Sequence, residues 1–222
     1  MSEPANGEPA LIRAALASDA LDRLGVLHHC LRPGIVPINL SRAPSHVLVG
    51  RAYTARAVPM TTVPESPYVT LLQALDGIGR GEVFVLATDR VEGSAFWGEL
   101  LSTACLARGA AGAITDGFVR DIALLVELSA SFPVFGRGGV PYDIHPRFEI
   151  AEYGKSVDID GITIEPGALI VADLDGVVVV PPGFDSAVLD LVAEKAGGES
   201  AFRSAVANGE LPSVAFAKYG VL

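Results

Sequence analysis

The sequence predicts an α/β domain, and three observations lead to this prediction. In the first two thirds of the chain, short apolar runs such as 81–87 and 112–115 alternate with segments of helical spacing such as 98–108. Beyond them the pattern changes to short strands around Asp-Gly turns, followed by helices. Half of the 222 residues are hydrophobic, enough for one sizeable core, and no internal repeat or long polar linker divides them. We therefore expect one domain over residues 9–222, preceded by a disordered N-terminus at residues 1–8.

Each element follows from its local pattern. β-branched residues and partial alternation indicate strands, apolar residues at helical spacing indicate helices, and Asp-Gly marks tight turns. The chain is expected to begin with helical turns at 11–16 and 20–24, with Ser18 and Asp19 as cap residues between them. Strands are then expected at 46–58, 81–87, 112–115 and 134–135, and between them helices at 69–75, 98–108 and 121–128. After residue 150 the chain is expected to form a hairpin at 157–164, paired strands at 168–172 and 177–180, a helix from Asp185 that Gly197-Gly198 breaks, and a last helix at 199–207.

Composition excludes some classes of function. Lysine plus arginine number 16 and aspartate plus glutamate 26, so the formal net charge is −10. This charge argues against nonspecific nucleic-acid binding, which depends on neutralising phosphates, but it permits docking on a basic protein. Cys30 and Cys105 lie far apart without a CxxC pattern, which favours a reducing cytosol over a disulfide framework. The N-terminus lacks a signal-peptide pattern, and no apolar run reaches the roughly 18 residues of a membrane span. We expect a soluble, cytoplasmic protein with neither nucleic-acid nor membrane partners.

The most informative stretch runs from Gly112 to Asp121. An apolar strand there meets the Asp116-Gly117 turn, which is followed by the adjacent cation and carboxylate of Arg120 and Asp121. Ligands of α/β proteins bind at such carboxyl ends of strands. Arg120 can bind a carboxylate in a bidentate way, and Asp121 can hold a hard divalent cation through oxygen. The simpler interpretation is a surface arginine beside an aspartate that caps the next helix.

A second candidate corner lies upstream, where Gly98 and Glu99 open a predicted helix. The free N–H groups of Leu100 and Leu101 would point out of the helix start and bind an anion, with Glu99 beside them as a direct or water-mediated metal ligand. In the alternative interpretation, Glu99 only stabilises the helix dipole. The two corners belong to consecutive strand–helix units, and neighbouring parallel strands would bring them together.

Several segments together form a recognisable pattern: SDALDRLG at 18–25, VGRAYTA at 49–55, WGELL at 97–101, RGAAG at 108–112, TDGFVRD at 115–121, Pro-Gly at 166–167 and DLDGVVVVP at 173–181. The most specific part is an acid, twenty residues and then Arg-Asp, which here are Glu99, residues 100–119 and Arg120-Asp121. In these segments the chain resembles the RraA-like family, which includes 4-hydroxy-4-methyl-2-oxoglutarate aldolases and regulators of ribonuclease E activity. The resemblance covers nearly the whole chain.

The resemblance implies a layered α/β/β sandwich, like the swivelling phosphohistidine domain, and homotrimers or homohexamers with active sites between subunits. In the aldolases of this family, the aspartate of the Arg-Asp pair holds Mg²⁺ or Mn²⁺, the arginine contacts pyruvate, and the amides after the upstream acid bind the pyruvate carboxylate. The corresponding residues here are Asp121, Arg120, and Leu100 with Leu101 next to Gly98. The upstream acid of the family is usually aspartate, so the longer Glu99 leaves open whether it reaches the metal directly or through water.

A C-terminal glutamate from a neighbouring subunit completes the site in this family. Glu199 is the best match and Glu194 a weaker one, while the simpler interpretation of Glu199 is an acid that opens a helix. The expected metal ligands are therefore Asp121, Glu99 and Glu199. An inter-subunit site is also favoured because the corner at Asp121 lacks a third carboxylate of its own.

The resemblance implies a carbon–carbon lyase that cleaves 4-hydroxy-2-oxo dicarboxylic acids, such as 4-hydroxy-4-methyl-2-oxoglutarate, to pyruvate. A divalent ion chelated by the substrate stabilises the enolate formed when the bond breaks, and Arg120 adds positive charge there. Oxaloacetate gives the same enolate when it loses CO₂, so decarboxylation is expected too. No lysine belongs to this constellation, which disfavours a Schiff-base aldolase. Two alternatives stay open: a protein that binds and restrains ribonuclease E without catalysis, and another enolate-forming enzyme whose substrate is set by loops 136–146 and the subunit interface.

Other residues with chemical potential receive mostly structural interpretations. The glycine loop at 136–139 lacks the following lysine and serine or threonine of a phosphate loop. The remaining interpretations are His28 and His29 as loop or surface residues, Trp97 as a core or interface anchor, Asp19 as a helix cap, residues 173–176 as a tight turn instead of a calcium loop, and His145 as a minor site candidate.

Overall fold

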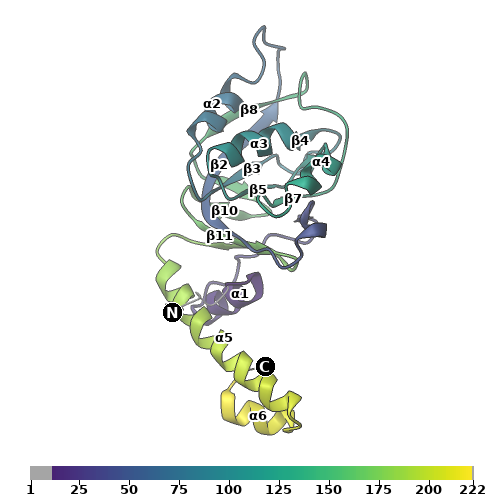
Figure 1. Cartoon of the computed structure of the whole chain (residues 1–222). Coiled ribbons are helices and arrows are strands. Elements are labelled where there is room, and N and C mark those ends of the chain that lie inside the picture. The colour runs from purple at the N-terminus through teal and green to yellow at the C-terminus, as the bar shows by residue number, and fades with distance from the viewer. Residues whose placement is uncertain (1–11, 222) are drawn as a thin grey trace, which may run out of the picture.

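The structure is a computed structural model that describes residues 12–221. Eight strands form its main sheet: β1 Val36–Pro37, β2 Leu48–Pro59, β3 Glu82–Ala87, β5 Gly112–Thr115, β7 Val134–Gly136, β8 Phe148–Tyr153, β11 Leu169–Asp173 and β12 Gly176–Val180. Their order is β1-β7-β5-β3-β2-β11-β12, with β8 paired to β2 (Figure 1). The pairs β2–β3, β3–β5 and β5–β7 are parallel, and the other pairs are antiparallel.

The main sheet is the middle of three layers. One face is covered by the helices α2 Val69–Gly77, α3 Glu99–Ala107 and α4 Ile122–Glu127, and the other by the hairpin of β9 Val157–Ile159 and β10 Ile162–Ile164. Successive strand residues point to opposite faces. Phe84 and Leu86 therefore pack in the core on the helix side, whereas Val83 and Val85 pack in the core on the hairpin side. This arrangement confirms the α/β/β layering predicted for the chain.

The two turns that the sequence marked with aspartate and glycine are confirmed. Asp160 and Gly161 join β9 to β10 with φ angles of 59° and 83°, the positive values that a two-residue hairpin turn of type I′ requires. β11 and β12 pair from Asp173 and Gly176 outward, so the segment between them is a tight turn. Asp173 accepts hydrogen bonds from the backbone N–H of Ala14 and Asp175, both at 2.9 Å, so its carboxylate fastens this turn to the backbone.

The N-terminal region forms one helix, α1 Ala14–Arg23, where two shorter pieces were expected. Ser18 and Asp19 lie inside this helix, so their interpretation as cap residues is wrong. Burial decides the difference, because Ala17 and Leu21 of α1 are fully buried in a core shared with β11 and β12. The predicted disorder of residues 1–8 lies outside the described residues.

The C-terminal helix α5 Asp185–Ala207 is continuous, so the break expected at Gly197-Gly198 is wrong. Each glycine costs a helix only about 1 kcal/mol relative to alanine, and α5 packs against both α1 and α6. α5 begins against the sheet, where Val188 and Val192 are buried, and then extends away from the body of the molecule (Figure 1). A further helix that was not expected, α6 Pro212–Tyr219, packs on its outer part. Within residues 12–221, no helix combines the length and apolar character that crossing a membrane demands.

Candidate active site

Two short strands that the sequence analysis missed, β4 Ala95–Trp97 and β6 Phe118–Val119, bring the two predicted corners together. They pair in parallel, with Trp97 opposite Val119, so both strands end at the same edge. The backbone N–H of Arg120 donates to the Trp97 carbonyl at 2.9 Å. A Cβ on Gly98 would lie 3.2 Å from Oδ2 of Asp121 and 3.3 Å from Cγ of Arg120. The absent side chain of Gly98 thus leaves the space in which Arg120 and Asp121 stand beside the start of α3.

Asp121 has an uncommon backbone conformation, with φ 58° and ψ 35° in the left-handed region. It is the N-cap residue of α4, as the simpler interpretation has it, but its side chain makes no capping hydrogen bond. This region is unfavourable for residues other than glycine, although aspartate tolerates it better than most. The carboxylate of Asp121 is 45% exposed and therefore accessible to a ligand.

Arg120 lies between two carboxylates. Its Nε is 3.8 Å from Oδ2 of Asp121, and its Nη2 is 3.7 Å from Oδ2 of Asp143. Both distances exceed the roughly 2.7–2.9 Å of a charge-assisted hydrogen bond. The guanidinium is consequently held near negative charge while its donors stay available to an anionic ligand.

The first turn of α3 is anchored to the core beneath it. The hydroxyl of Ser102 accepts a hydrogen bond from Nε1 of Trp97 at 2.8 Å and donates one to the Gly98 carbonyl at 3.1 Å. Trp97 is fully buried and packs on Phe84, which supports its interpretation as a core residue. The first N–H groups of a helix have no acceptor within it, and Leu100 in this turn is 74% exposed. The anchored helix start therefore presents backbone donors next to Arg120.

The acidic residues of this corner fit a partly hydrated divalent ion better than a complete protein cage. Among residues 12–221, no group of three or more His, Cys, Asp or Glu side chains is placed to hold a metal ion. Mg²⁺ commonly binds through one or two carboxylates and keeps several waters. Asp121 offers one such carboxylate. Glu99 lies in the adjoining helix turn, where its Oε1 accepts a hydrogen bond from Oγ1 of Thr103 at 2.6 Å.

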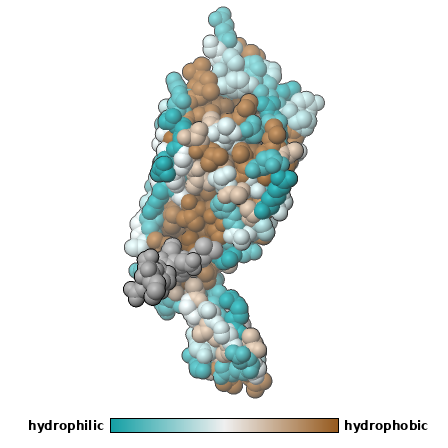
Figure 2. All heavy atoms as spheres, in the orientation of Figure 1, coloured by the Kyte–Doolittle hydropathy of each residue, from teal (hydrophilic) through white to brown (hydrophobic). Residues whose placement is uncertain are grey.

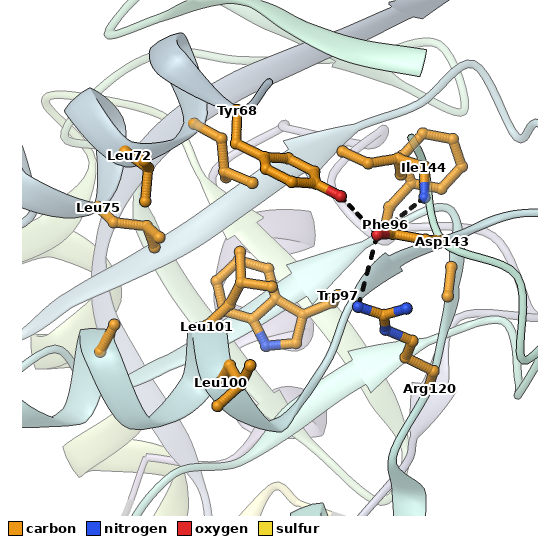
Figure 3. A pocket seen from close by; sticks show the side chains of 13 residues that line it. Tyr68, Leu72, Leu75, Phe96, Trp97, Leu100, Leu101, Arg120, Asp143 and Ile144 are labelled. Carbon is orange, nitrogen blue, oxygen red and sulfur yellow. Dashed lines mark hydrogen bonds and ion pairs between the residues drawn. The ribbon is translucent and has the colours of Figure 1, made fainter. Parts of the chain in front are cut away.

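Two further polar residues, Tyr68 and Asp143, belong to this site and were not selected from the sequence. The Tyr68 hydroxyl donates to Oδ2 of Asp143 at 2.6 Å, and the same oxygen faces Arg120 (Figure 3). Burial, together with the hydrogen bond to Asp143, raises the pKa of Tyr68 to about 12. Tyr68 also has a left-handed backbone, with φ 64°. Nothing in the local spacing marks either residue, because Tyr68 lies far from Asp143 in sequence and only the fold brings them together.

A pocket of about 300 Å³ opens beside these residues (Figure 3). Tyr68, Asp143 and Arg120 line one end, and leucines of α2 and α3 line the other. Apolar side chains also gather on the outer surface over these two helices (Figure 2). The described lining residues are Tyr68, Leu71, Leu72, Leu75, Ala95, Phe96, Trp97, Leu100, Leu101, Ala104, Arg120, Asp143 and Ile144.

Asp116 is buried beside the site and its side chain bonds to the backbone of the chain, so it does not face a ligand. Its carboxylate is 1% exposed and accepts hydrogen bonds from the backbone N–H groups of Thr88 at 2.6 Å and Arg90 at 2.9 Å. Burial raises the pKa of Asp116, and these hydrogen bonds oppose the rise. A Cβ on Gly117 would lie 2.7 Å from Cδ2 of Phe96, so glycine is required by close packing there. The Asp116-Gly117 turn is therefore structural.

The structure does not bring Glu199 or Glu194 to the Arg120–Asp121 corner within one chain. Both lie on α5, which Figure 1 shows at the opposite end of the molecule from α3 and α4. Glu199 is 3.8 Å from Arg203, and Glu194 pairs with Arg23 at 3.2 Å. Glu199 also lies inside a continuous helix, so its interpretation as a helix-opening acid is wrong. Its contribution to the site of another subunit stays a prediction.

Two histidines have side chains in defined surroundings, His29 and His145. His29 is 4% exposed; its Nδ1 hydrogen-bonds the Val26 carbonyl at 2.6 Å and its Nε2 the Ser18 hydroxyl at 2.9 Å, which makes it a buried loop residue. The ring of His145 lies 5.8 Å from that of Tyr68, but His145 is not among the described residues that line the pocket. Its buried Nδ1 makes no hydrogen bond within the part of the chain that the structure describes.

Comparisons with known proteins identify the family of this chain. A model of the RraA-like family, described as Aldolase/RraA, matches residues 14–179. The chain belongs to the RraA-like family. This RraA-like chain is 29% identical over 191 residues, 86% of its length, to a Halalkalibacterium halodurans protein named "Putative 4-hydroxy-4-methyl-2-oxoglutarate aldolase", of which 83% is covered.

Two further likenesses extend the comparison. The protein DlpA of Legionella pneumophila is 29% identical over 168 residues, which are 76% of the RraA-like chain but only 26% of DlpA. The crystal structure of RraAS2 from Streptomyces coelicolor, described as an unusual member of the RNase ES inhibitor RraA protein family, matches with a TM-score of 0.78 and 25% identity. That match covers 88% of this chain and 94% of RraAS2. The family and the fold expected from the sequence are both confirmed.

Proposed function

We propose that this RraA-like protein is a divalent-metal-dependent, class II aldolase. It releases pyruvate from 4-hydroxy-2-oxo acids, the class to which the expected dicarboxylic substrates belong, and it decarboxylates oxaloacetate. The observation that carries the proposal is the position of Arg120 and Asp121 beside Gly98 at the start of α3. A guanidinium, an accessible carboxylate and free backbone amides meet there, which is the set of groups that binds a small 2-oxo acid together with a hard cation. The name of the Halalkalibacterium relative supports an aldolase.

The residues of this chain divide the work of binding. The amides of Leu100 and Leu101 receive the carboxylate of the pyruvate unit, and Arg120 places positive charge against its oxygens as negative charge develops. Asp121, with Glu99 beside it, would hold Mg²⁺ or Mn²⁺, which supplies Lewis-acid stabilisation of the enolate when bound. No lysine is among the described residues that line the pocket, so a Schiff-base route has no candidate nucleophile there.

A coupled assay tests the reaction. Pyruvate is measured with lactate dehydrogenase, with and without Mg²⁺ or Mn²⁺, from oxaloacetate and from 4-hydroxy-4-methyl-2-oxoglutarate. We expect metal-dependent pyruvate release that Asp121→Ala abolishes, because the variant removes the accessible carboxylate of the corner. Asp190→Ala, which removes an exposed aspartate of α5, is the matched control and should keep wild-type activity. Undiminished turnover in Asp121→Ala would sink the mechanism.

The competing function is non-catalytic binding to ribonuclease E. The net charge of −10 suits a basic partner, and the description of RraAS2 names an inhibitor of such an enzyme. A titration against ribonuclease E separates the two functions. Absence of pyruvate from every substrate, together with binding that Asp121→Ala leaves intact, would favour this alternative.

A further inference from the structure

The pocket beside Arg120 is polar at one end and apolar at the other. Figure 3 shows Tyr68, Asp143 and Arg120 gathered at one side, with Leu72 and Leu75 of α2 across the cavity from them. Leu100 and Leu101, whose amides belong to the proposed site, also line this pocket with their side chains. The apolar end is consequently continuous with the place where the pyruvate unit is proposed to bind.

The charges of the pocket bear on what the far end of a substrate can be. Arg120 is the one cation among the described lining residues, and Asp143 adds a carboxylate 3.7 Å from it. A substrate with a second carboxylate would place that group among the leucines of α2, across the cavity from Arg120. There a carboxylate would lose part of its hydration without gaining a cationic partner, which is unfavourable. An uncharged hydrocarbon group, in contrast, gains by leaving water there.

We propose that the substrate of this protein is a 2-oxo acid with an uncharged apolar tail at its distal end, and that the leucines of α2 and α3 select for that tail. The inference rests on the proposed function for the position of the pyruvate unit. It differs from that function in rejecting a dicarboxylic acid as the preferred substrate. A pocket of about 300 Å³ is at the small end of ligand pockets, which suits a short alkyl or single-ring tail.

Binding of non-cleavable analogues gives the first test. The dissociation constants of 2-oxobutanoate, 2-oxohexanoate and 2-oxooctanoate are compared with that of 2-oxoglutarate by calorimetry, with and without Mg²⁺. We expect each added methylene to tighten binding by about fourfold until the pocket is full, since one buried methylene is worth about 0.8 kcal/mol. We also expect 2-oxoglutarate to bind more weakly than 2-oxohexanoate. Affinity that does not change with chain length, the result if a side chain of another subunit fills the apolar end, would overturn the inference.

The second test adds a positive charge at the apolar end of the pocket and measures whether the preference between the two ligands changes. Leu72 lines the pocket and is 55% exposed, so Leu72→Lys adds a cation at the apolar end with little cost to folding. Gln73→Lys adds the same charge at the next, exposed position of α2, which is not among the lining residues. The ratio of affinities for 2-oxohexanoate and 2-oxoglutarate should fall at least tenfold in Leu72→Lys and stay at the wild-type value in Gln73→Lys. Equal ratios in the two variants would contradict the proposed role of Leu72.

Pyruvate release separates failure of the inference from failure of the proposed function. Cleavage of 4-hydroxy-2-oxo acids with alkyl tails in preference to dicarboxylic ones supports both. Preferential cleavage of the dicarboxylic acids leaves the aldolase proposal standing and overturns the apolar tail. Release from neither class, with no binding of any 2-oxo acid, overturns both. The series on the wild-type protein is decisive by itself if Leu72→Lys does not fold.

Discussion

Gly98 and Asp121 shape the candidate site through their backbones as much as through their side chains. Gly98 gives room to the Arg120–Asp121 pair, and the left-handed conformation of Asp121 accompanies a carboxylate that makes no capping hydrogen bond. Residues held in sparsely populated conformations concentrate at functional sites, where the surrounding structure maintains them. Tyr68, at φ 64°, follows the same pattern on the other side of the pocket.

Gly98→Ala tests the close approach. A Cβ at this position would lie within 3.3 Å of both Arg120 and Asp121, so the pair must move by a few tenths of an ångström. We expect kcat/KM for pyruvate release to fall by about tenfold to hundredfold, because reacting groups tolerate little misplacement. The melting temperature should change little, since the carboxylate at 121 is half-exposed. Full activity in this variant would show that pyruvate release does not depend on the exact position of Arg120 and Asp121.

Tyr68 should remain neutral throughout the range in which the protein is assayed. Its pKa is raised to about 12, so the folded protein holds this proton more tightly than the unfolded chain. The tyrosine therefore contributes stability below pH ~10 that is lost as the pH rises toward 12. Burial also raises the pKa of Tyr53, so a spectrophotometric titration of tyrosinate is compared between the wild type and Tyr68→Phe, and the variant should lack one late ionisation. A titration of Tyr68 near pH 10 would contradict the half-buried hydrogen bond to Asp143.

At the scale of elements, β4 and β6 determine the geometry of the site although each is very short. Their parallel pairing places the start of α3 next to the turn before α4. Asp116 braces this arrangement from within by binding the backbone at Thr88 and Arg90. The longer strands and helices were recognisable from periodicity, whereas a strand of two or three residues carries too few positions to show one. Tertiary hydrogen bonds, which local sequence does not reveal, define these strands.

Continuity of α5 through Gly197-Gly198 is testable by a matched pair of substitutions. A Cβ at Gly197 would meet nothing within 4 Å, so Gly197→Ala should raise the free energy of unfolding by roughly 0.5–1 kcal/mol. A Cβ at Gly198 would lie 3.1 Å from Cγ1 of Val221, so Gly198→Ala should gain less. Denaturant unfolding of both variants provides the measurement. Destabilisation by Gly197→Ala would indicate that the helix breaks there after all.

At the scale of the whole molecule, the site and the C-terminal arm formed by α5 and α6 lie at opposite ends (Figure 1). The described residues of the Arg120–Asp121 corner form no cluster of three metal-ligating side chains, while Glu199 lies on the arm with its side chain 30% exposed. In an assembly of subunits, the arm of one chain could reach the corner of another. Glu199 of the first chain would then lie beside Arg120 and Asp121 of the second. We therefore keep the prediction of a homotrimer or homohexamer with a shared site.

Subunit mixing tests the shared site. Asp121→Ala and Glu199→Gln are each expected to lose pyruvate release, since each removes one contribution to the same centre. If the two contributions come from different chains, mixed assemblies contain some intact sites and regain activity that neither variant has alone. The assay is run on co-expressed variants, with the separately purified variants as controls. A Glu199→Gln variant of wild-type activity would remove Glu199 from the site.

The amino-acid sequence by itself determined the fold class, the family, and the corner at residues 98–101 and 116–121, because hydrophobic periodicity and the Glu99 to Arg120-Asp121 spacing are properties of contiguous chain. Only the tertiary structure decided that Asp116 is a buried brace, that α5 is unbroken, and that Tyr68 and Asp143 belong to the pocket. These features depend on burial and on contacts between segments far apart in the chain, such as the 2.6 Å hydrogen bond from Tyr68 to Asp143. Local sequence pattern carries no information about such contacts. The apolar end of the pocket likewise depends on the fold, because it forms where α2 and α3 lie side by side.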